Sequence, residues 1–453
     1  MRISFMLMLL CFTASVASQS IAPRLSAAYE KLMRDDQFKY AIVGMTVIDQ
    51  QTGKVLFDRN GNVGLAAAST QKILTAVTAF DLLGVQFNYT TKFLTRKINA
   101  TTTALYVLGS GDPTLGSWRF ESTKPARLFS ALDVAMPTSS SLMVGYLDDQ
   151  HYDPVAVPGT WMIDDIGNYY GAGSWNINWR ENQYDLHLSS DKIVGGPVSI
   201  RSEPGLPKYQ NHLKVGKPGS GDNAYIYLPT ADSVYILKGT IPPNERDFVI
   251  SGAVPDGRMF MIAELVRHWV GRGNSVTAVG KVEADLLKGA KVIYEHQSPK
   301  LDSIIFYFLR KSINLYGEAL LKTIGYRNAD SAHTEVGTRA MKAHLISVNV
   351  PPGAVAVLDG SGLSPQNRIT STALATVLQY ALKRAWFNSF YNALPVYNGM
   401  KMKSGSIGGV RSFAGYHKAS NGKMYSFSII VNNYNGSSGS VVQKLYKVLD
   451  ELK

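Results

Sequence analysis

Residues 66–84 read AAASTQKILTAVTAFDLLG, a run of small residues followed by a serine, a lysine and a long apolar segment. The apolar positions recur at helical spacing after Lys72, and Gly84 follows the last of them, so the stretch predicts a helix that starts near Ser69 and stops at Gly84. Residues three apart share one face of a helix. The amine of Lys72 is therefore expected within reach of the Ser69 hydroxyl.

This pairing suits nucleophilic catalysis, because a serine hydroxyl reacts only when a neighbouring base takes its proton. A lysine at its ordinary pKa of roughly 10.4 is no base at neutral pH. The positive end of the helix dipole and a second cation, Lys403, are expected to lower the pKa of Lys72. The free N–H of Ser69 and another N–H from the strand at Lys403–Ser406 predict an oxyanion hole. A plain N-cap hydroxyl is the ordinary alternative for Ser69.

Two further elements favour the nucleophile over that alternative. They are Ser312-Ile313-Asn314, beside a helical segment, and Lys403-Ser404-Gly405, in a strand. Taken singly, Ser312 and Asn314 are ordinary polar loop residues and Lys403 is an ordinary charge at a strand edge. Their order after Ser69-x-x-Lys72, and their placement on a helix start, a helix-flanking loop and a strand, make the combination specific to serine acyl-transfer chemistry.

Patterning along the chain predicts one α/β unit interrupted by an insertion. Residues 19–88 and 295–453 carry the patterns of that unit, and residues 89–294 consist of short β-type runs between Gly, Pro and Asn turns, which predicts a mostly β insertion of one or two domains. A final helix that closes the sheet is favoured over a membrane-surface anchor. The elements expected in the unit are helices at 25–33, 301–309, 315–324 and 441–452 and strands at 40–49, 55–57 and 425–431, with Gly325 as a helix C-cap.

Composition limits the class of protein. The chain has 453 residues, of which 45% are apolar, and this is enough for a large core and two or three domains. Lys and Arg number 46 against 34 Asp and Glu, and the net charge of +12 suits an envelope polymer, a membrane surface or nucleic acid. The charges are dispersed, and the predicted export argues against nucleic acid.

Export is predicted by residues 1–18, which have a charged start, an apolar middle and small residues up to Ser18. Cys11, the only cysteine, lies within this segment, so the exported chain is expected to have no disulfide and no thiolate ligand. No later stretch reaches the roughly 20 apolar residues of a membrane-spanning helix. We therefore expect a protein of the periplasm or cell envelope, soluble once the signal peptide is removed and without a stable membrane anchor.

Several longer motifs accompany the three short elements. They are Gly109–Leu115, Pro158–Trp161 followed by Asp164-Asp165 and Tyr169-Tyr170, Ser312–Glu318, and Asp359-Gly360-Ser361-Gly362-Leu363-Ser364. In these motifs the chain resembles the class C low-molecular-mass penicillin-binding proteins, a family of D-alanyl-D-alanine carboxypeptidases and endopeptidases. The resemblance covers nearly the whole chain after the signal segment. It implies a penicillin-binding-protein or β-lactamase-like domain, an antiparallel sheet flanked by helices, that is split by a large insertion.

The resemblance also implies a role for each motif residue. Ser69 would attack the carbonyl between two terminal D-alanines of a peptidoglycan peptide, and Lys72 would accept its proton. Ser312 would relay a proton to the leaving amine, and Asn314 would bind the substrate backbone. The terminal carboxylate would be held by Lys403, Ser404, Gly405 and Ser406. β-Lactam antibiotics would act as covalent inhibitors, and neither a metal nor another cofactor is expected.

Two positions depart from the family pattern. The usual Lys-Thr-Gly is here Lys403-Ser404-Gly405, which keeps the hydroxyl. Pro365-Gln366-Asn367 stands where relatives often carry an arginine that recognises a diaminopimelate side chain. Arg368 is one candidate to replace that arginine. Asp164 and Asp165, placed by the segment of Trp161, are candidates to bind the ammonium of such a side chain, and Trp161 itself is a candidate substrate-binding residue.

Other functions are less well supported by the residues. A β-lactamase would need fast deacylation, for which no added carboxylate base is evident, and a lapsed peptidoglycan-binding protein would be expected to have lost one of the polar motif residues. The eight histidines show no metal-ligand spacing. Gly109-Ser110-Gly111-Asp112 lacks the third glycine of a dinucleotide loop and shows no βαβ pattern around it, so a turn at a strand end is expected there.

Overall fold

The computed structural model describes residues 21–147, 149–201, 207–229 and 233–453. The predicted signal segment at 1–18, with Cys11, lies outside the described residues. Within the described ranges, no helix is both long and apolar enough to cross a bilayer.

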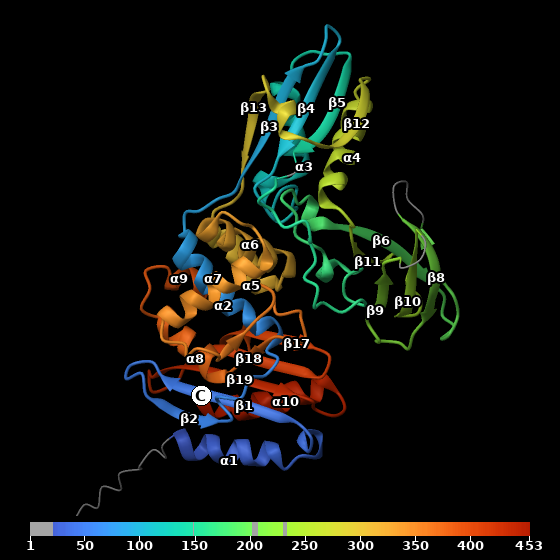
Figure 1. The fold of residues 1–453 in the computed structure, drawn as a ribbon. Coiled ribbons are helices and arrows are strands. Elements are labelled where there is room, and N and C mark those ends of the chain that lie inside the picture. The colour runs from blue at the N-terminus through green and yellow to red at the C-terminus, as the bar shows by residue number, and fades with distance from the viewer. Residues whose placement is uncertain (1–20, 148, 202–206, 230–232) are drawn as a thin grey trace, which may run out of the picture.

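A six-stranded antiparallel sheet forms the base of the molecule (Figure 1). Its strand order is β16-β17-β18-β19-β1-β2, and β1 pairs with β19 from Ile42 opposite Asn432 to Asp49 opposite Tyr425. The first and the last strands of the described chain are therefore neighbours in the interior of one sheet. The strands are β1 (Ile42–Asp49), β2 (Val55–Arg59), β16 (Val396–Tyr397), β17 (Met400–Ile407), β18 (Val410–Lys418) and β19 (Met424–Asn432).

Helices cover both faces of this sheet because its strands alternate two apolar faces. Val43, Met45 and Val47 of β1 pack on one face with α1 (Ile21–Met33) and α10 (Ser438–Leu449). On the other face Ala414, Tyr416 and Ile430 join the core of the remaining helices of this unit. The final helix therefore buries its apolar side against the sheet, as the sequence predicted. The expected fold, an antiparallel sheet flanked by helices, is confirmed.

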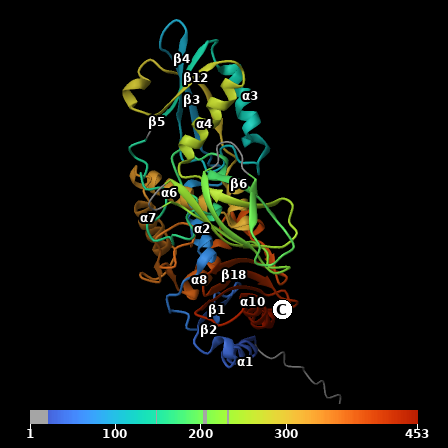
Figure 2. The ribbon, with the colours of Figure 1, turned by 90° about the vertical axis from the view of Figure 1, so that its right-hand side faces the viewer.

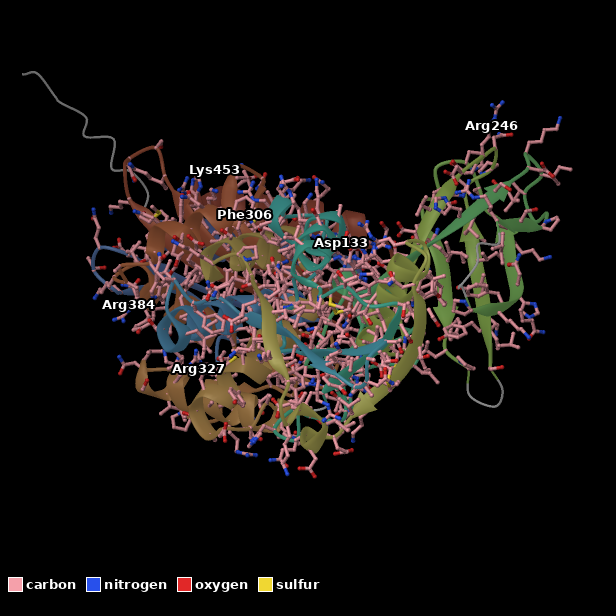
Figure 3. All side chains as sticks on the ribbon, turned by 90° about the horizontal axis from the view of Figure 1, so that it is seen from above. Asp133, Arg246, Phe306, Arg327, Arg384 and Lys453 are labelled. Atoms are coloured by element: carbon pink, nitrogen blue, oxygen red, sulfur yellow. The ribbon has the colours of Figure 1, made fainter. Side chains whose placement is uncertain are left out.

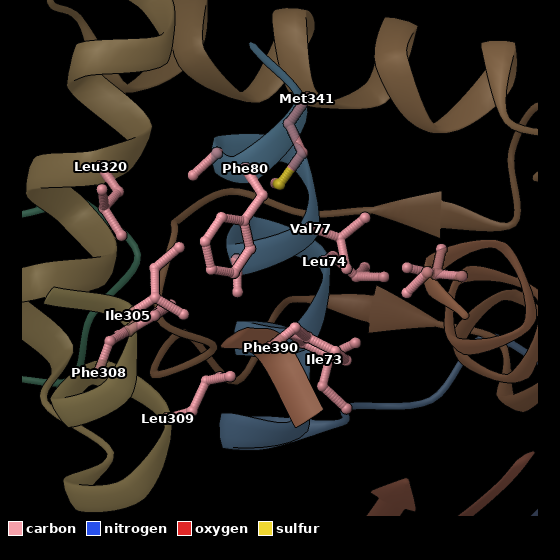
Figure 4. Packing of buried hydrophobic residues seen from close by; sticks show 14 of the residues in the cluster. Ile73, Leu74, Val77, Phe80, Ile305, Phe308, Leu309, Leu320, Met341 and Phe390 are labelled. Carbon is pink, nitrogen blue, oxygen red and sulfur yellow. The ribbon is translucent and has the colours of Figure 1, made fainter. Parts of the chain in front are cut away.

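The helix that follows Ser69 lies at the centre of the helical layer. Every residue of α2 (Lys72–Leu83) up to Phe80 is buried, which is typical of a helix that is surrounded on all sides. Figure 4 shows Ile73, Leu74, Val77 and Phe80 packed among side chains of the neighbouring helices. Those helices are α5 (Leu301–Lys311), α6 (Asn314–Ala329), α7 (Thr334–Ser347), α8 (Ser371–Ala381) and α9 (Phe387–Ala393), and a small ladder joins β14 (Val355–Ala356) to β15 (Arg368–Ile369).

The predicted C-cap at Gly325 is wrong. Helix α6 continues to Ala329 and ends at Asp330, which adopts the left-handed conformation. A Cβ atom at Gly325 would lie 2.9 Å from the backbone nitrogen of Gly337 in α7. The glycine therefore allows two helices to approach closely instead of ending one of them.

Between α2 and α5 the described residues form three further sheets. The first, at the opposite end of the molecule from α1, has the order β12-β5-β4-β3-β13 (Figures 1 and 2). Helices α3 (Pro125–Ala135) and α4 (Gly257–Val270) contribute Leu128, Leu132, Ile262 and Leu265 to its core. The strands are β3 (Thr90–Lys97), β4 (Thr102–Leu108), β5 (Ser141–Leu147), β12 (Ser275–Val282) and β13 (Lys291–Gln297).

This sheet corrects one statement made from the sequence. Strands β4 and β5 are parallel and α3 lies between them in the chain, so a βαβ unit does surround Gly109–Asp112. The segment Gly109–Asp112 nevertheless does not lead directly into a helix, because α3 begins only at Pro125. A Cβ atom at Gly109 would lie 2.2 Å from the carbonyl oxygen of Asn176, so this glycine serves close packing.

The other two sheets of the insertion form a small lobe. Their orders are β11-β6-β7 and β8-β10-β9, and apolar residues of both meet in one core. Figure 3, seen from above, shows this lobe, which carries Arg246, projecting from the body that carries Phe306 and Arg384. The strands are β6 (Gln183–Ser190), β7 (Val198–Arg201), β8 (Lys208–Val215), β9 (Asn223–Tyr227), β10 (Val234–Ile241) and β11 (Phe248–Ala253).

Candidate active site

Ser69 lies in a single 3-10 turn, Ala68–Gln71, directly before α2. Side chains of the central sheet hold this turn in place: Asn432 bonds both backbone groups of Ala66, and Ser412 donates to the carbonyl of Ala67 at 2.6 Å. Ala68 has a φ of 48°, an uncommon conformation for a residue with a side chain. Ser69 itself is partly exposed, while its neighbours on both sides are buried.

Lys72 contacts Ser69 directly. Its Nζ lies 2.8 Å from Ser69 Oγ, 2.7 Å from Asn314 Oδ1 and 2.7 Å from the carbonyl oxygen of Ser361. The side chain of Lys72 is completely buried. The predicted meeting of a serine with a lysine amine is therefore present, and the Ser361 carbonyl is a partner that spacing alone does not reveal.

Burial lowers the pKa of Lys72 to about 7, and the nearby carboxylates Asp359 and Glu318 oppose this shift. A buried ammonium loses its hydration, so the neutral amine is favoured. The direction of the shift agrees with the sequence-based expectation, but its principal cause is burial and not the helix dipole. At neutral pH a large fraction of Lys72 is thus uncharged and able to accept a proton.

Ser312 and Asn314 lie at the junction of α5 and α6. Ser312 ends α5 in the left-handed conformation, and Asn314 begins α6. The Asn314 amide is oriented by two contacts, with Oδ1 toward Lys72 and Nδ2 donating to the carbonyl of Tyr170 at 2.8 Å. Ser312 is partly exposed, and among the described residues its hydroxyl makes no hydrogen bond to Ser69 or Lys72.

Lys403 brings a second lysine to the site from β17. It is almost completely buried, its Nζ donates to the carbonyl of Ser404 at 2.8 Å, and its pKa is well below the ordinary value because of burial and then the charge of Lys72. The mutual repulsion means that protonation of one amine disfavours protonation of the other. An anion bound at Lys403 would stabilise the protonated form of Lys403 and so favour the neutral form of Lys72.

The strand that carries Lys403 is open on one side. From Lys403 onward β17 forms the edge of the sheet, and a two-residue turn joins it to β18. In such a hairpin alternate residues face the partner strand, so the N–H groups of Ser404 and Ser406 point to the open edge. A Cβ atom at Gly405 would lie 3.1 Å from the nitrogen of Ser69, so the strand backbone touches the turn of Ser69. The N–H groups of Ser69 and Ser406 are thus available for an oxyanion.

The structure gives Trp161 a different position from the one expected of a substrate contact. Its side chain is buried, and its indole N–H donates to Asp359 Oδ2 at 2.9 Å. Asp164 and Asp165 are partly exposed on the following loop, and burial together with the charge of Asp164 raises the pKa of Asp165 to about 6. The same loop reaches Tyr170, whose carbonyl contacts Asn314. Arg368 folds back onto the carbonyls of Pro365 and Asn367.

Two buried carboxylates at the site were not singled out by the sequence. Asp359 and Glu318 are fully buried, and burial together with Asp359 raises the pKa of Glu318 to about 8. Both lie in motifs that carried the family resemblance, and no pattern assigned them a task.

One group among the described residues has the composition of a metal site. Ligand atoms of Asp153, His333 and Glu335 lie within 4.8 Å of one another. The buried ammonium of Lys322 is 3.9 Å from Asp153 Oδ2, so a cation already faces this group. Lys322 also donates to the carbonyls of Val155 and Ser174, which ties the insertion to α6.

Comparisons with known proteins agree with this geometry. A model of the D-Ala-D-Ala carboxypeptidase 3 (S13) family matches residues 25–452. The chain is 24% identical to a D-alanyl-D-alanine carboxypeptidase of Actinomadura sp. over 451 residues, covering 91% of this chain and 82% of that protein. It is also 24% identical to the D-alanyl-D-alanine carboxypeptidase DacB of Haemophilus influenzae, covering 89% of this chain and 87% of that protein.

Solved structures with the same fold include two cell-wall enzymes. Penicillin-binding protein 4 of Haemophilus influenzae superposes with a TM-score of 0.79 at 21% identity and covers 94% of this chain and 99% of its own. The predatory peptidoglycan endopeptidase Bd3459 of Bdellovibrio bacteriovorus superposes with a TM-score of 0.52 at 13% identity and covers 90% and 91%. At these identities the superpositions establish the shared fold.

Proposed function

Because this chain belongs to the D-Ala-D-Ala carboxypeptidase 3 (S13) family, as its motifs predicted, we propose that Ser69 is the nucleophile with which it hydrolyses D-Ala-D-Ala peptides of peptidoglycan. The observation that supports this assignment best is the 2.8 Å contact between the Ser69 hydroxyl and a buried lysine amine. A base in hydrogen-bond contact with the nucleophile, and with a pKa near the working pH, is what acyl transfer by serine requires.

Acylation begins when Ser69 Oγ attacks the carbonyl carbon between the two D-alanines. The hydroxyl proton passes to the neutral amine of Lys72, and the carbonyl oxygen becomes an oxyanion that the N–H groups of Ser69 and Ser406 stabilise. The bond to the leaving amine then breaks, and a proton returns to that nitrogen from Lys72 through the hydroxyl of Ser312. The terminal D-alanine departs, and an ester links the rest of the peptide to Ser69.

Deacylation reverses these roles. A water molecule takes the place of the leaving amine, gives a proton to Lys72 and attacks the ester carbonyl. The ester bond breaks and the proton returns to Ser69 Oγ, which regenerates the free enzyme. Lys403 and the hydroxyls of Ser404 and Ser406 hold the terminal carboxylate and so align the scissile bond with Ser69.

The same site serves two kinds of leaving group. A free D-alanine leaves in carboxypeptidase action, and a D-amino acid centre of a neighbouring stem peptide leaves when a cross-link is cut. We propose that both are substrates. Initial rates on a pentapeptide monomer and on a purified cross-linked dimer would test this, and no release from the dimer would restrict the enzyme to carboxypeptidase action.

We also propose export of the protein to the periplasm or cell envelope, which rests on the pattern of residues 1–18. Mass spectrometry of the protein recovered from that compartment should give a chain that begins after Ser18. A full-length mass there would contradict the proposal.

Labelled penicillin tests the nucleophile. Intact-mass analysis is expected to show one covalent adduct on the wild type and none on Ser69→Ala. Ser347→Ala, which changes an exposed serine at the end of α7, is the matched control and should be labelled as the wild type is. A folded wild type that gains no adduct would contradict the assignment of Ser69.

The lifetime of the penicillin adduct distinguishes a carboxypeptidase from a β-lactamase, which is the main alternative. A β-lactamase hydrolyses its acyl-enzyme quickly, and the site of Ser69 offers Lys72 as the only base in direct contact among the described residues. We expect an adduct that persists for minutes or longer. Turnover of penicillin at several molecules per second would favour the β-lactamase.

A further inference from the structure

The motif Asp359–Ser364 forms a buried loop behind Lys72. The carboxylate of Asp359 is inaccessible to solvent and accepts five hydrogen bonds. They come to Oδ1 from Gln71 Nε2 (2.8 Å), Gly362 N (2.8 Å) and Asn367 Nδ2 (2.9 Å), and to Oδ2 from Trp161 Nε1 (2.9 Å) and Ser364 N (2.7 Å). With its acceptor capacity used by the protein, Asp359 has no direct part in binding substrate.

The loop presents two of its carbonyls to the helix of the base. Gly360 O accepts from Thr75 Oγ1 at 2.6 Å, and Ser361 O accepts from Lys72 Nζ at 2.7 Å. On its other side the loop is held by Glu318 of α6, whose two oxygens accept from the nitrogen of Gly360. The position of the Ser361 carbonyl is therefore set by carboxylates on both sides.

The partners of Lys72 determine where its lone pair points. A neutral amine has two hydrogens and one lone pair in a tetrahedral arrangement. Asn314 Oδ1 and the Ser361 carbonyl oxygen have no hydrogen to give, so each must receive one of the two N–H groups. The remaining position, which is the lone pair, faces Ser69 Oγ at 2.8 Å. The two acceptors thus orient the lone pair of Lys72 toward the hydroxyl of Ser69.

Both acceptors are fixed by the same segment of the insertion. The Trp161 indole donates to Asp359, which holds the loop of Ser361, and the Tyr170 carbonyl accepts from Asn314 Nδ2, which turns Oδ1 toward Lys72. We propose that residues 161–170 of the insertion, acting through Asp359 and Asn314, are positioning residues that aim the Lys72 lone pair at Ser69. This inference rests on the proposed role of Ser69 and Lys72.

The charges around Lys72 are compatible with this role. Asp359, Glu318 of α6 and Lys403 of β17 all lie near the amine, and the two acids act to raise its pKa against the effect of burial. A substitution that removes one of these charges would change the titration of the others as well. The decisive variant is therefore one that removes a hydrogen bond and leaves every charge in place.

Trp161→Phe is such a variant, and the chain offers a matched control. Trp386 is equally buried, and its indole N–H donates at 2.9 Å to the carboxylate of Asp81, a partly buried residue near the far end of α2. Trp161→Phe and Trp386→Phe each delete one indole donor to a carboxylate, at a similar expected cost of about 1 kcal/mol in stability. Only the first deletion lies behind the base.

The experiment measures two quantities with a penicillin. Stopped-flow kinetics give the rate constant for acylation, and calorimetry in a Ser69→Ala background gives the affinity before acylation. We expect Trp161→Phe to slow acylation at least threefold with unchanged affinity, and Trp386→Phe to acylate at the wild-type rate. Asp359→Asn, which places an N–H donor against two existing donors, should slow acylation at least tenfold, whereas Asp81→Asn should not.

Several results would overturn the inference. An acylation rate constant of Trp161→Phe within twofold of the wild-type value would do so. An equal decrease of this rate constant in Trp386→Phe would do so too, as would a matching loss of penicillin affinity in Trp161→Phe. If Asp359→Asn fails to fold, the result with Trp161→Phe decides. A wild type that forms no adduct would instead contradict the proposed function, so the two failures are distinguishable.

Discussion

Lys72 differs from a solvated lysine in two ways, since it is completely buried and its amine meets three fixed partners. Burial makes the neutral form accessible at neutral pH, and the partners decide what that neutral form does. Lys403 lies close enough that the two amines influence each other. In the proposed mechanism, catalysis therefore depends on which lysine carries the proton at each stage.

The pH dependence of acylation follows from the pKa of Lys72. Only the neutral amine accepts the proton of Ser69, and burial lowers its pKa to about 7, so acylation should rise with pH, reach half of its maximum near pH 7 and level off above it. Penicillin acylation rates between pH 5 and 9 measure this curve. Lys72→Arg, which stays charged, should form no adduct at any of these pH values. A half-maximum above pH 9 would contradict the assignment.

Recognition of the substrate carboxylate is expected to depend on Lys403. A charged hydrogen bond is worth about 1.5–3 kcal/mol, so the wild type should favour a peptide acid over the matching peptide amide by roughly 10–150-fold in kcat/KM. Lys403→Met should lose this preference. Lys401→Met, two residues earlier on the same strand, should keep it. Steady-state kinetics on the two peptides make the comparison, and an undiminished preference in Lys403→Met would place the carboxylate elsewhere.

At the scale of elements, the turn of Ser69 is enclosed between a strand, a helix and a buried loop. Gly362 of that loop has a φ of 83°, and a Cβ atom there would lie 2.1 Å from the carbonyl oxygen of Ala68. Gly353 has a similar φ of 82° but no atom within 4 Å of such a Cβ. A comparison of the two positions therefore distinguishes the cost of the left-handed backbone conformation from the cost of a steric overlap.

Alanine substitutions exploit this difference. Gly353→Ala should cost about 1–2 kcal/mol in the free energy of unfolding, because only the left-handed conformation is penalised. Gly362→Ala should cost about 1–3 kcal/mol more, because the methyl group overlaps the residue before the nucleophile. Urea unfolding of both variants measures the difference. Equal losses of stability would show that the loop moves away without resistance.

Sequence patterns predicted some elements better than others. The helix after Ser69 and the last helix follow from regular apolar spacing, and both are present. Helices α3 and α4 were missed because they lie among β-type runs, although Met261, Ile262, Leu265 and Trp269 share one buried face. Gly325 was misjudged because a glycine that allows two helices to pack looks, in sequence, like one that ends a helix.

At the scale of the whole molecule, the sequence related the candidate site residues to one another unequally. Ser69 and Lys72 meet because local helical geometry brings them together. Asn314 and Lys403 come from elements that only the family resemblance related to Ser69. The contacts of Trp161 with Asp359 and of Tyr170 with Asn314 join the insertion to the rest of the chain, and no periodicity or spacing encodes such long-range pairs.

The distribution of charge is also a property of the whole molecule. Residues 21–88 and 295–453 contain 25 Lys and Arg against 14 Asp and Glu, whereas residues 89–294 contain 20 of each. The excess positive charge of residues 21–453 therefore belongs to the unit that carries Ser69. A positive unit attracts anionic substrates before they bind.

Ionic strength should reveal this attraction. The Debye length falls from about 30 Å at 0.01 M salt to about 3 Å at 1 M. We expect kcat/KM for an acidic stem peptide to fall several-fold over this range, and kcat/KM for the same peptide with its side-chain acids amidated to change less. Equal salt dependence of the two peptides would rule out steering by the charge of this unit.

The pairing of β1 with β19 has a consequence for the order in which the protein can fold. Residues 50–423 separate these two neighbouring strands in the sequence, so β1 waits for its partner until all of those residues have been synthesised. The three sheets between α2 and α5 have all their strands much earlier and are free to form first. Since β17, with Lys403, joins the same late sheet, an unfinished chain lacks an assembled site. The hydrolase is therefore expected to become active only after β19 has joined the sheet.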